Sequence, residues 1–144
     1  MSNTLFHLSF AVDDLDRARA FYGKLLGCPE GRKVPGRVDF NFFGHHLVAH
    51  LAPGDVVGFK GRTVNASERT PLRHFGVVMS IEDFEKTAGK LTEAGAQFIN
   101  QPDVRRKGTV WEQMLMTCND TCGNAVEFKG LRNITDVYAE AKEP

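Results

Sequence analysis

Residues 5–27 read LFHLSFAVDDLDRARAFYGKLLG. Side chains alternate in character from Leu5 to Val12, which is the period of a strand with one oily and one mixed face. Asp13 and Asp14 then offer an N-cap, and apolar residues recur at helical spacing until Gly27 ends the run. The stretch predicts a strand followed by one amphipathic helix.

The second half of the chain repeats this pattern. Leu72 to Ser80 alternates in the same way, and Ser80 is placed to cap a helix that runs to Gly95. Further strands are expected at Arg37 to Phe43, His46 to Ala52, Gln97 to Asn100, Thr109 to Cys118 and Asn124 to Lys129, with a tight turn at Gly44-His45. The pattern predicts two βαβββ modules, a weak internal duplication.

Composition limits the classes of partner. Of 144 residues, 42% are hydrophobic and 25% are charged, and Lys+Arg and Asp+Glu both total 18, so no charged surface for nucleic acid or membrane is expected. The sequence has no apolar run of membrane-spanning length and no signal peptide, which predicts a cytoplasmic protein with a small-molecule ligand. Cys118 and Cys122 are expected to be reduced structural thiols, with metal chelation as the alternative.

The two modules place a histidine at the same point of their first strand, His7 and His74. If the oily residues face the helices, both histidines face the opposite side of the sheet, where the modules are expected to enclose a cavity. The same parity puts Glu127 on that side in the last strand, and His50 in the last strand of module one. A single strand histidine or glutamate is usually structural, so the prediction of a metal site rests on the set.

Imidazoles combined with a carboxylate suit Fe(II), Ni(II), Zn(II), Mn(II) or Co(II) better than Ca(II) or Mg(II). A triad of His7, His74 and Glu127 would leave open positions for substrate and O₂, as in non-haem Fe(II) oxygenases. His50 is either a fourth ligand, which favours Lewis-acid chemistry, or an acid-base group. Phe40, Phe42 and Trp111 are candidates to line a substrate pocket, with filling of the core as the favoured interpretation.

The chain resembles the vicinal oxygen chelate superfamily, which includes glyoxalase I, extradiol dioxygenases, fosfomycin resistance enzymes and bleomycin-binding proteins. The resemblance spans nearly the whole chain. It is carried by the His7 strand with residues 12–18 and 21–27 behind it, by His74-Phe75-Gly76-Val77, and by Gly123-Asn124-Ala125-Val126-Glu127-Phe128. It implies an α+β fold of two tandem βαβββ modules whose curved mixed sheets surround a metal ion.

By this resemblance residues 1–144 form a single glyoxalase/dioxygenase-like domain. Module one covers about 4–52, a linker 53–71, module two about 72–130 and a polar or shortly helical tail 131–144. His7, His74 and Glu127 fall on the ligand positions of extradiol dioxygenases, while His50 replaces the usual glutamate of glyoxalase-type members. Asp120-Thr121-Cys122 stands where many members have Asp-Pro-Asp or Asp-Pro-Glu, a change expected to alter the turn.

The subgroup most similar in appearance consists of bacterial proteins described as predicted extradiol-dioxygenase relatives. The resemblance implies a metal-dependent, dioxygenase-like oxidoreductase, with Fe(II) favoured, that acts on a small diol or catechol-like substrate. Two alternatives stay open: a glyoxalase-like lyase or isomerase with a non-redox metal, and a non-catalytic small-molecule binding protein. A homodimer is expected by family analogy.

Overall fold

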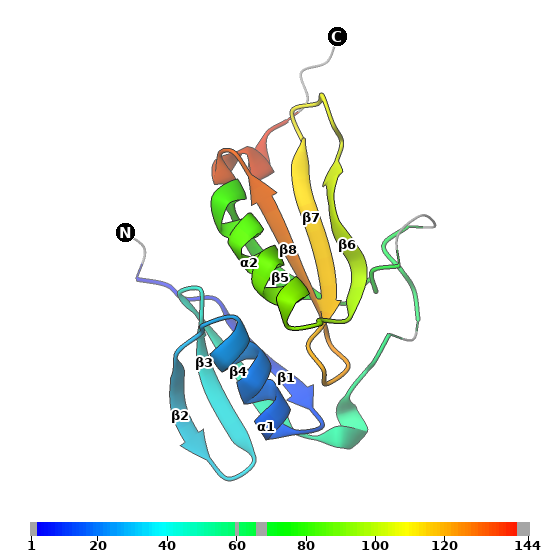
Figure 1. Cartoon of the computed structure of the whole chain (residues 1–144). Coiled ribbons are helices and arrows are strands. Elements are labelled where there is room, and N and C mark those ends of the chain that lie inside the picture. The colour runs from blue at the N-terminus through cyan, green and yellow to red at the C-terminus, as the bar shows by residue number, and fades with distance from the viewer. Residues whose placement is uncertain (1–2, 60, 66–68, 141–144) are drawn as a thin grey trace. The chain divides into compact units, whose positions relative to one another are not determined.

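The computed structural model describes residues 3–59, 61–65 and 69–140, and the chain forms two compact units. Unit 1 comprises Met1–Lys60 with Asn119–Asn124, and unit 2 comprises Gly61–Cys118 with Ala125–Pro144. Each unit contains a four-stranded sheet with a helix packed on it (Figure 1). Within the described ranges, no helix combines the length and apolar character needed to cross a membrane.

Both sheets have the same connectivity. Unit 1 orders its strands β1-β4-β3-β2 and unit 2 orders them β5-β8-β7-β6, and in each the first and last strands of the module pair in parallel. The predicted α+β fold of two tandem βαβββ modules is therefore confirmed. The strands are β1 (His7–Val12), β2 (Glu30–Val34), β3 (Arg37–Phe42), β4 (His45–Leu51), β5 (Phe75–Ser80), β6 (Phe98–Arg105), β7 (Gln113–Asn119) and β8 (Ala125–Leu131).

The helix of unit 1 begins where the sequence predicts. The Asp14 carboxylate accepts a hydrogen bond from the Arg17 backbone N–H at 2.9 Å, which caps α1 (Leu15–Ala18). The helix continues as η1 (Arg19–Leu25) with π-type hydrogen bonding. The wider turn buries two consecutive aromatic residues, Phe21 and Tyr22, against the sheet.

Aromatic rings fill the core of unit 1. The Tyr22 ring packs against Phe10 at 5.5 Å, Phe40 at 5.5 Å and Phe42 at 6.2 Å between ring centroids. Phe40 and Phe42 are buried, which confirms that they fill the core. Because Phe10 faces the helix, His7, Ser9 and Ala11 lie on the other face of the sheet, which we call the open face.

In unit 2, α2 (Ile81–Glu93) is capped by the Ser80 hydroxyl, which accepts from the Asp83 N–H at 3.1 Å. The buried residues Phe84 and Leu91 form its inner face. Phe84 approaches β8 so closely that a Cβ at Gly130 would lie 2.7 Å from the Phe84 Cβ. Gly130 therefore faces α2. Residues of the opposite parity on β8, including Glu127, lie on the other face, the open face of this sheet.

Several predicted boundaries are wrong. The first strand begins at His7 rather than Leu5, and β5 begins at Phe75 rather than Leu72, so His74 lies just before the strand instead of within it. The Leu72 N–H donates to the Arg62 carbonyl at 2.7 Å, which holds the preceding segment outside the sheet. The hairpin turn is centred on Phe43 and Gly44, both with positive φ, rather than on Gly44-His45.

Two edge strands differ from the prediction: β2 was not predicted, and β6 is longer than the predicted strand at Gln97 to Asn100. β2 (Glu30–Val34) is almost entirely exposed and polar, so no apolar alternation announces it. β6 runs to Arg105 through Pro102, where the register against β7 shifts between Asn100 and Asp103. Such an irregularity on an edge strand is where proline is tolerated. β7 starts at Gln113 rather than Thr109.

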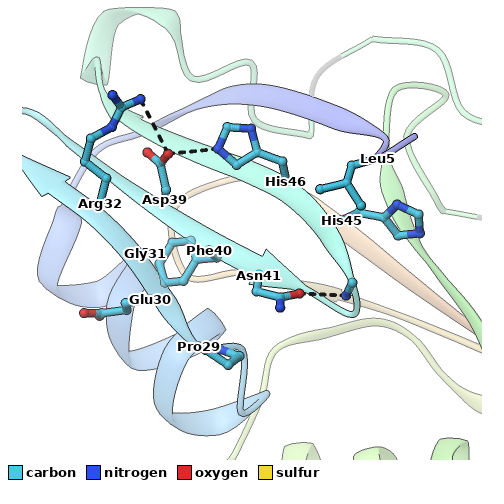
Figure 2. Close-up of a pocket in the computed structure, with 11 residues that line it drawn as sticks. Leu5, Pro29, Glu30, Gly31, Arg32, Asp39, Phe40, Asn41, His45 and His46 are labelled. Atoms are coloured by element: carbon cyan, nitrogen blue, oxygen red, sulfur yellow. Dashed lines mark hydrogen bonds and ion pairs between the residues drawn. The ribbon is translucent and has the colours of Figure 1, made fainter. Parts of the chain in front are cut away.

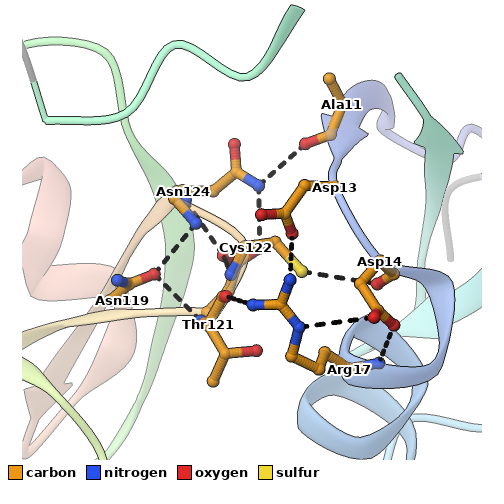
Figure 3. Close-up of polar contacts among 10 residues, drawn as sticks. Ala11, Asp13, Asp14, Arg17, Asn119, Thr121, Cys122 and Asn124 are labelled. Carbon is orange, nitrogen blue, oxygen red and sulfur yellow. Dashed lines mark hydrogen bonds and ion pairs between the residues drawn. The ribbon is translucent and has the colours of Figure 1, made fainter. Parts of the chain in front are cut away.

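Figure 3 shows Arg17 beside the turn between β7 and β8, which belongs to unit 1. The buried Asp120 holds this turn. The Asp120 carboxylate accepts hydrogen bonds from the Cys122 N–H at 2.8 Å and from the Tyr22 hydroxyl at 2.6 Å. Arg17 donates to the Thr121 carbonyl at 2.6 Å. Thr121 has φ 72°, a value that the ring of proline forbids, so the turn would not keep this conformation with a proline at position 121.

The remaining segments are short. Pro53–Asp55 and Ile134–Tyr138 form 3₁₀ turns, η2 and η3, and the Trp111 indole N–H donates to the Ala139 carbonyl at 2.8 Å. Trp111 thus lies in a loop, half-exposed, and does not fill the core as predicted for it. Residues 60, 66–68 and 141–144 of the predicted linker and tail lie outside the described residues. Cys28, Cys118 and Cys122 are buried and form no disulfide within the part of the chain that the structure describes.

Candidate metal centre

His74 and Glu127 meet on the open face of unit 2. The His74 Nδ1 atom lies 2.8 Å from the Pro71 carbonyl oxygen, and because a carbonyl only accepts, Nδ1 carries the proton. In the neutral ring this leaves a lone pair on Nε2. That atom lies 3.5 Å from Glu127 Oε2.

The Glu127 carboxylate is buried, at 6% exposure, yet the contacts described for its oxygens are long. Thr117 Oγ1 lies 3.5 Å from Oε2, and Lys129 Nζ lies 3.6 Å from Oε1. When His74 is neutral, the lone pairs of His74 Nε2 and Glu127 Oε2 face each other and repel. A cation coordinated by both atoms would remove this repulsion. The pair therefore fits two ligands of a transition metal, with the Pro71 carbonyl orienting the ring from behind.

A cavity of about 230 Å³ opens at this pair and is lined by residues 74–78 of the β5 segment and by Glu127 and Lys129 of β8. Gly76 pairs with Glu127 in the sheet, and a Cβ on it would overlap the Glu127 carbonyl oxygen. A glycine at position 76 is thus required for the close approach of β5 to the backbone that presents the carboxylate.

On the open face of unit 1, His7 pairs with His46 rather than with a carboxylate. The two Nδ1 atoms lie 2.9 Å apart and the rings stack, with centroids 4.7 Å apart and planes inclined at 24°. One proton must lie between two ring nitrogens at this distance. Both Nδ1 atoms are occupied by this contact, so Nε2 is the ring nitrogen of His7 left for a ligand.

Behind His46 stands Asp39, a buried carboxylate. His46 Nε2 lies 2.8 Å from Asp39 Oδ2, and the Arg37 guanidinium donates to Asp39 Oδ1 at 2.8 and 3.1 Å. Burial raises the pKa of Asp39, but the hydrogen bonds from His46 and Arg37 and the charges of Arg37 and Arg32 together lower it below its ordinary value. Asp39 is accordingly ionised at neutral pH.

A cavity of about 440 Å³ lies beside this chain of contacts (Figure 2). Leu5, Asn41, Asp39 and His46 are among the residues that line it. The His46 ring is therefore reachable from solvent although its carboxylate partner is buried.

His50 lies in β4 opposite Ala11 and Arg37, on the same face as His46 and four residues further along the strand. Its lateral neighbour is thus not His7, which pairs with His46. Within residues 3–59, 61–65 and 69–140, no three His, Cys, Asp or Glu side chains gather closely enough to hold a metal ion. The structure brings together His74 with Glu127 in unit 2, and His7 with His46 in unit 1.

Sequence reasoning missed three residues of the two open faces. His46 lies on the same strand face as His50, so strand parity is the signal that could have found it. Asp39 shares its face with His46, and its signal is that it is the only acidic residue of β3. Lys129 stands two residues after Glu127 and shares its face by the same parity.

Comparison with known proteins agrees with this architecture. The model of the Glyoxalase/Bleomycin resistance protein/Dioxygenase superfamily matches residues 4–128. A glyoxalase/bleomycin resistance protein/dioxygenase from Alicyclobacillus acidocaldarius is 28% identical with a TM-score of 0.76, the match covering 94% of this chain and 97% of that one. No curated protein is significantly similar to the chain.

More distant structures share the fold. The fosfomycin resistance protein FosX from Listeria monocytogenes is 15% identical with a TM-score of 0.69, over 94% of this chain and 98% of that one. Lactoylglutathione lyase from Agrobacterium tumefaciens is 17% identical with a TM-score of 0.63, over 96% and 98%. The family match, the two sheets of identical connectivity and these neighbours lead to one conclusion: the chain belongs to the Glyoxalase/Bleomycin resistance protein/Dioxygenase superfamily.

Proposed function

We propose that this protein is a metal-dependent enzyme of the vicinal oxygen chelate type, with a divalent transition metal held by His7, His74 and Glu127. The preferred ion is Fe(II), with Ni, Zn, Mn and Co as alternatives, and the preferred reaction is dioxygenation of a small diol or catechol-like substrate. The observation that carries the proposal is the His74–Glu127 pair, in which Nε2 and Oε2 face each other at 3.5 Å.

The donor set is the reason for preferring a transition metal. Imidazole nitrogen selects these ions over Ca(II) and Mg(II), and two histidines with one carboxylate leave coordination positions open. When bound, such an ion supplies Lewis acidity that lowers the pKa of a coordinated hydroxyl group and, if it is Fe(II), a site for O₂. The Pro71 carbonyl fixes the tautomer of His74 whatever the ion is.

The position of Lys129 supports the proposed class of substrate. Its ammonium group lies 3.6 Å from Glu127 Oε1 in the same cavity, and the side chain is 35% exposed. Once the Glu127 charge is shared with a divalent ion, the lysine is left without full compensation. A substrate that presents an ionised oxygen, such as a catecholate or enediolate, would restore the balance of charge.

A second candidate is a glyoxalase-like lyase or isomerase with a non-redox metal. Its support is His50, which lies on the open face of unit 1 and would act there as a fourth ligand or as an acid-base group. A third candidate is a binding protein without catalysis, for which the histidine and carboxylate donors have no evident use.

The metal and the reaction are tested together. Protein purified without oxygen is analysed for metal, and O₂ consumption is then measured over a panel of catechols. Iron with O₂ uptake supports the dioxygenase, whereas nickel or zinc without uptake supports the lyase or isomerase. Stoichiometric binding of a substrate analogue with no metal at all would leave only the binding protein.

The ligand set is tested by substitution. His74→Ala and Glu127→Ala should each abolish stoichiometric metal binding, and retention of full binding in either variant contradicts the assignment. His50→Ala separates the two enzymes, because loss of a ligand weakens metal affinity whereas loss of an acid-base group spares it. Glu82→Ala is a suitable control, because it removes an exposed carboxylate of α2 that pairs with Lys86 at 3.1 Å.

We also propose that the protein acts as a homodimer on a small molecule. Light scattering gives the mass, and mixing His7→Ala with Glu127→Ala chains tests where the ligands of one ion come from. If each site combines unit 1 of one chain with unit 2 of another, the mixed dimer regains one intact site. If all ligands of a site come from one chain, the mixture binds no more metal than its components.

A further inference from the structure

We infer that His46 and Asp39 form a positioning relay that holds His7 in the tautomer protonated on Nδ1, so that His7 Nε2 presents a lone pair. The inference builds on the proposed function, because it assigns the ligand atom of His7. His46 and Asp39 are not among the proposed metal ligands and act through His7, so both are positioning residues rather than catalytic ones.

The direction of the relay follows from the identity of its last member. Asp39 is a carboxylate whose two oxygens only accept, and Arg37 donates to Oδ1 from two nitrogens. The contact of 2.8 Å between Oδ2 and His46 Nε2 therefore needs the proton on His46 Nε2. A neutral His46 then has its lone pair on Nδ1.

His46 in turn determines the tautomer of His7. Because His46 Nδ1 accepts, the 2.9 Å contact between the two Nδ1 atoms requires His7 Nδ1 to donate. His7 Nε2 is then unprotonated, as a metal ligand must be. Arg37, which donates to Asp39 Oδ1 at 2.8 and 3.1 Å, already compensates the charge of Asp39, so the carboxylate does not depend on a positively charged His46.

Packing supports a defined geometry. The stacking of the two rings, with centroids 4.7 Å apart, restricts rotation of His7 about its side chain. Asp39 is 7% exposed and lies on β3, which is adjacent in the sheet to β4, the strand that carries His46. A buried acid that acts through one imidazole on another thus orients His7, just as the Pro71 carbonyl acts directly on His74.

The test reads the tautomer without any metal. In ¹⁵N-labelled apo-protein at about pH 8, where an ordinary imidazole is neutral, long-range ¹H–¹⁵N correlation spectra distinguish a protonated Nδ1 from a protonated Nε2. Wild-type His7 should carry its proton on Nδ1. His46→Phe, which keeps an aromatic ring but removes the acceptor, should shift His7 toward the Nε2-protonated form.

Asp39→Asn is the second variant, because an amide of the same shape is able to donate to His46 Nε2 and reverse both tautomers. Zinc affinity, measured by competition with a chelator, should fall by about 10- to 100-fold in both variants. Arg32→Gln is the matched control: Arg32 reaches the same Asp39 oxygen at 3.8 Å from an exposed position, and its loss should leave tautomer and affinity unchanged.

Finding wild-type His7 protonated on Nε2, or finding no shift in either folded variant, would overturn the relay. Failure of the proposed function gives a different result: the wild-type tautomer is as inferred and responds to both substitutions, but the protein binds no zinc. Folding of each variant is checked from its backbone amide spectrum before the histidine signals are interpreted.

Discussion

The open faces of the two sheets are built on one plan but carry different side chains at equivalent positions. The shared register pairs Ser9 with Val48 in unit 1 and Gly76 with Glu127 in unit 2. At the next position on the same face, Ala11 pairs with His50 and Val78 with Lys129. The carboxylate that faces a histidine in unit 2 is thus replaced by valine in unit 1.

The difference shows how each unit prepares its histidine. In unit 2 the ring is held by a backbone carbonyl, and a buried carboxylate faces its free nitrogen. In unit 1 the buried acid, Asp39, contacts His46, and His46 contacts His7. Asp39 therefore acts on the His7 ring through His46 and does not face the His7 Nε2 atom as a second ligand. Under the proposed function, unit 2 would supply two metal ligands, and unit 1 would supply one ligand whose ring is oriented by the buried acid.

The largest effect is expected from Gly76→Ala. The added Cβ would overlap the carbonyl oxygen of Glu127, which is backbone and has no rotamer to yield. We expect a loss of more than about 3 kcal/mol in the free energy of unfolding, or no folded protein. The control is Ser9→Ala, since Ser9 is the equivalent position in unit 1, and it should cost at most about 0.5 kcal/mol. Urea unfolding of both variants decides, and equal stability of Gly76→Ala and wild type would contradict the close approach.

Glu127→Gln should uncouple stability from metal. In the absence of metal the substitution removes a buried charge with only long contacts, so the variant should be at least as stable as wild type. With zinc at 100 times its dissociation constant, wild type should gain about 2.7 kcal/mol and the variant almost nothing. Thermal unfolding with and without zinc measures both effects. An equal gain in the two proteins would remove Glu127 from the ligand set.

Much of this fold was predictable because the spacing of hydrophobic residues along the chain distinguishes strands from helices. The helix after β1, the Ser80 cap and the repeated module all follow from spacing and capping residues. β2 was not predicted, since an exposed polar edge strand buries no alternate face. His74 was assigned to a strand because alternation continues through it, although the hydrogen bond from Leu72 to Arg62 keeps this segment outside the sheet.

For the candidate site, the sequence predicted only the sheet face on which each residue lies. Strand parity placed Glu127 and His50 on the open faces, but parity gives no distance between neighbouring strands. The lateral partner of His7 depends on the register of β1 against β4, which brings His46 rather than His50 beside it. The role of Asp39 depends on its contact with His46 on the neighbouring strand, and no local sequence pattern encodes such a contact.

A smaller effect is expected from Asp39→Asn in unit 1. At neutral pH the variant should lose about 2 kcal/mol, because Arg37 and His46 exchange a carboxylate for an amide. The pKa of Asp39 is lowered in the folded protein, so its contribution is present above the ordinary value near 4 and is lost as pH falls through the lower folded value. The stability gap between variant and wild type should therefore narrow below about pH 4. Unfolding measured from pH 7 to pH 3 tests this, and a constant gap would contradict the charge-dependent role of Asp39.

The smallest effect concerns Lys129, which occupies the position of His50 in the other sheet. Lys129→Met should change the stability of the apo-protein by no more than about 0.5 kcal/mol, because the ammonium group is partly exposed and its contact with Glu127 is long. Binding of oxalate, a small dianion, to the zinc-loaded protein should weaken by about fivefold and become less sensitive to salt, since one attractive charge is lost. Lys86→Met removes the same charge from α2, where Lys86 pairs with Glu82 at 3.1 Å, and should leave oxalate affinity unchanged. If both variants weaken oxalate equally, net charge explains the effect and Lys129 does not select the substrate; if only Lys129→Met does, unit 2 supplies the anion-binding group as well as the carboxylate ligand.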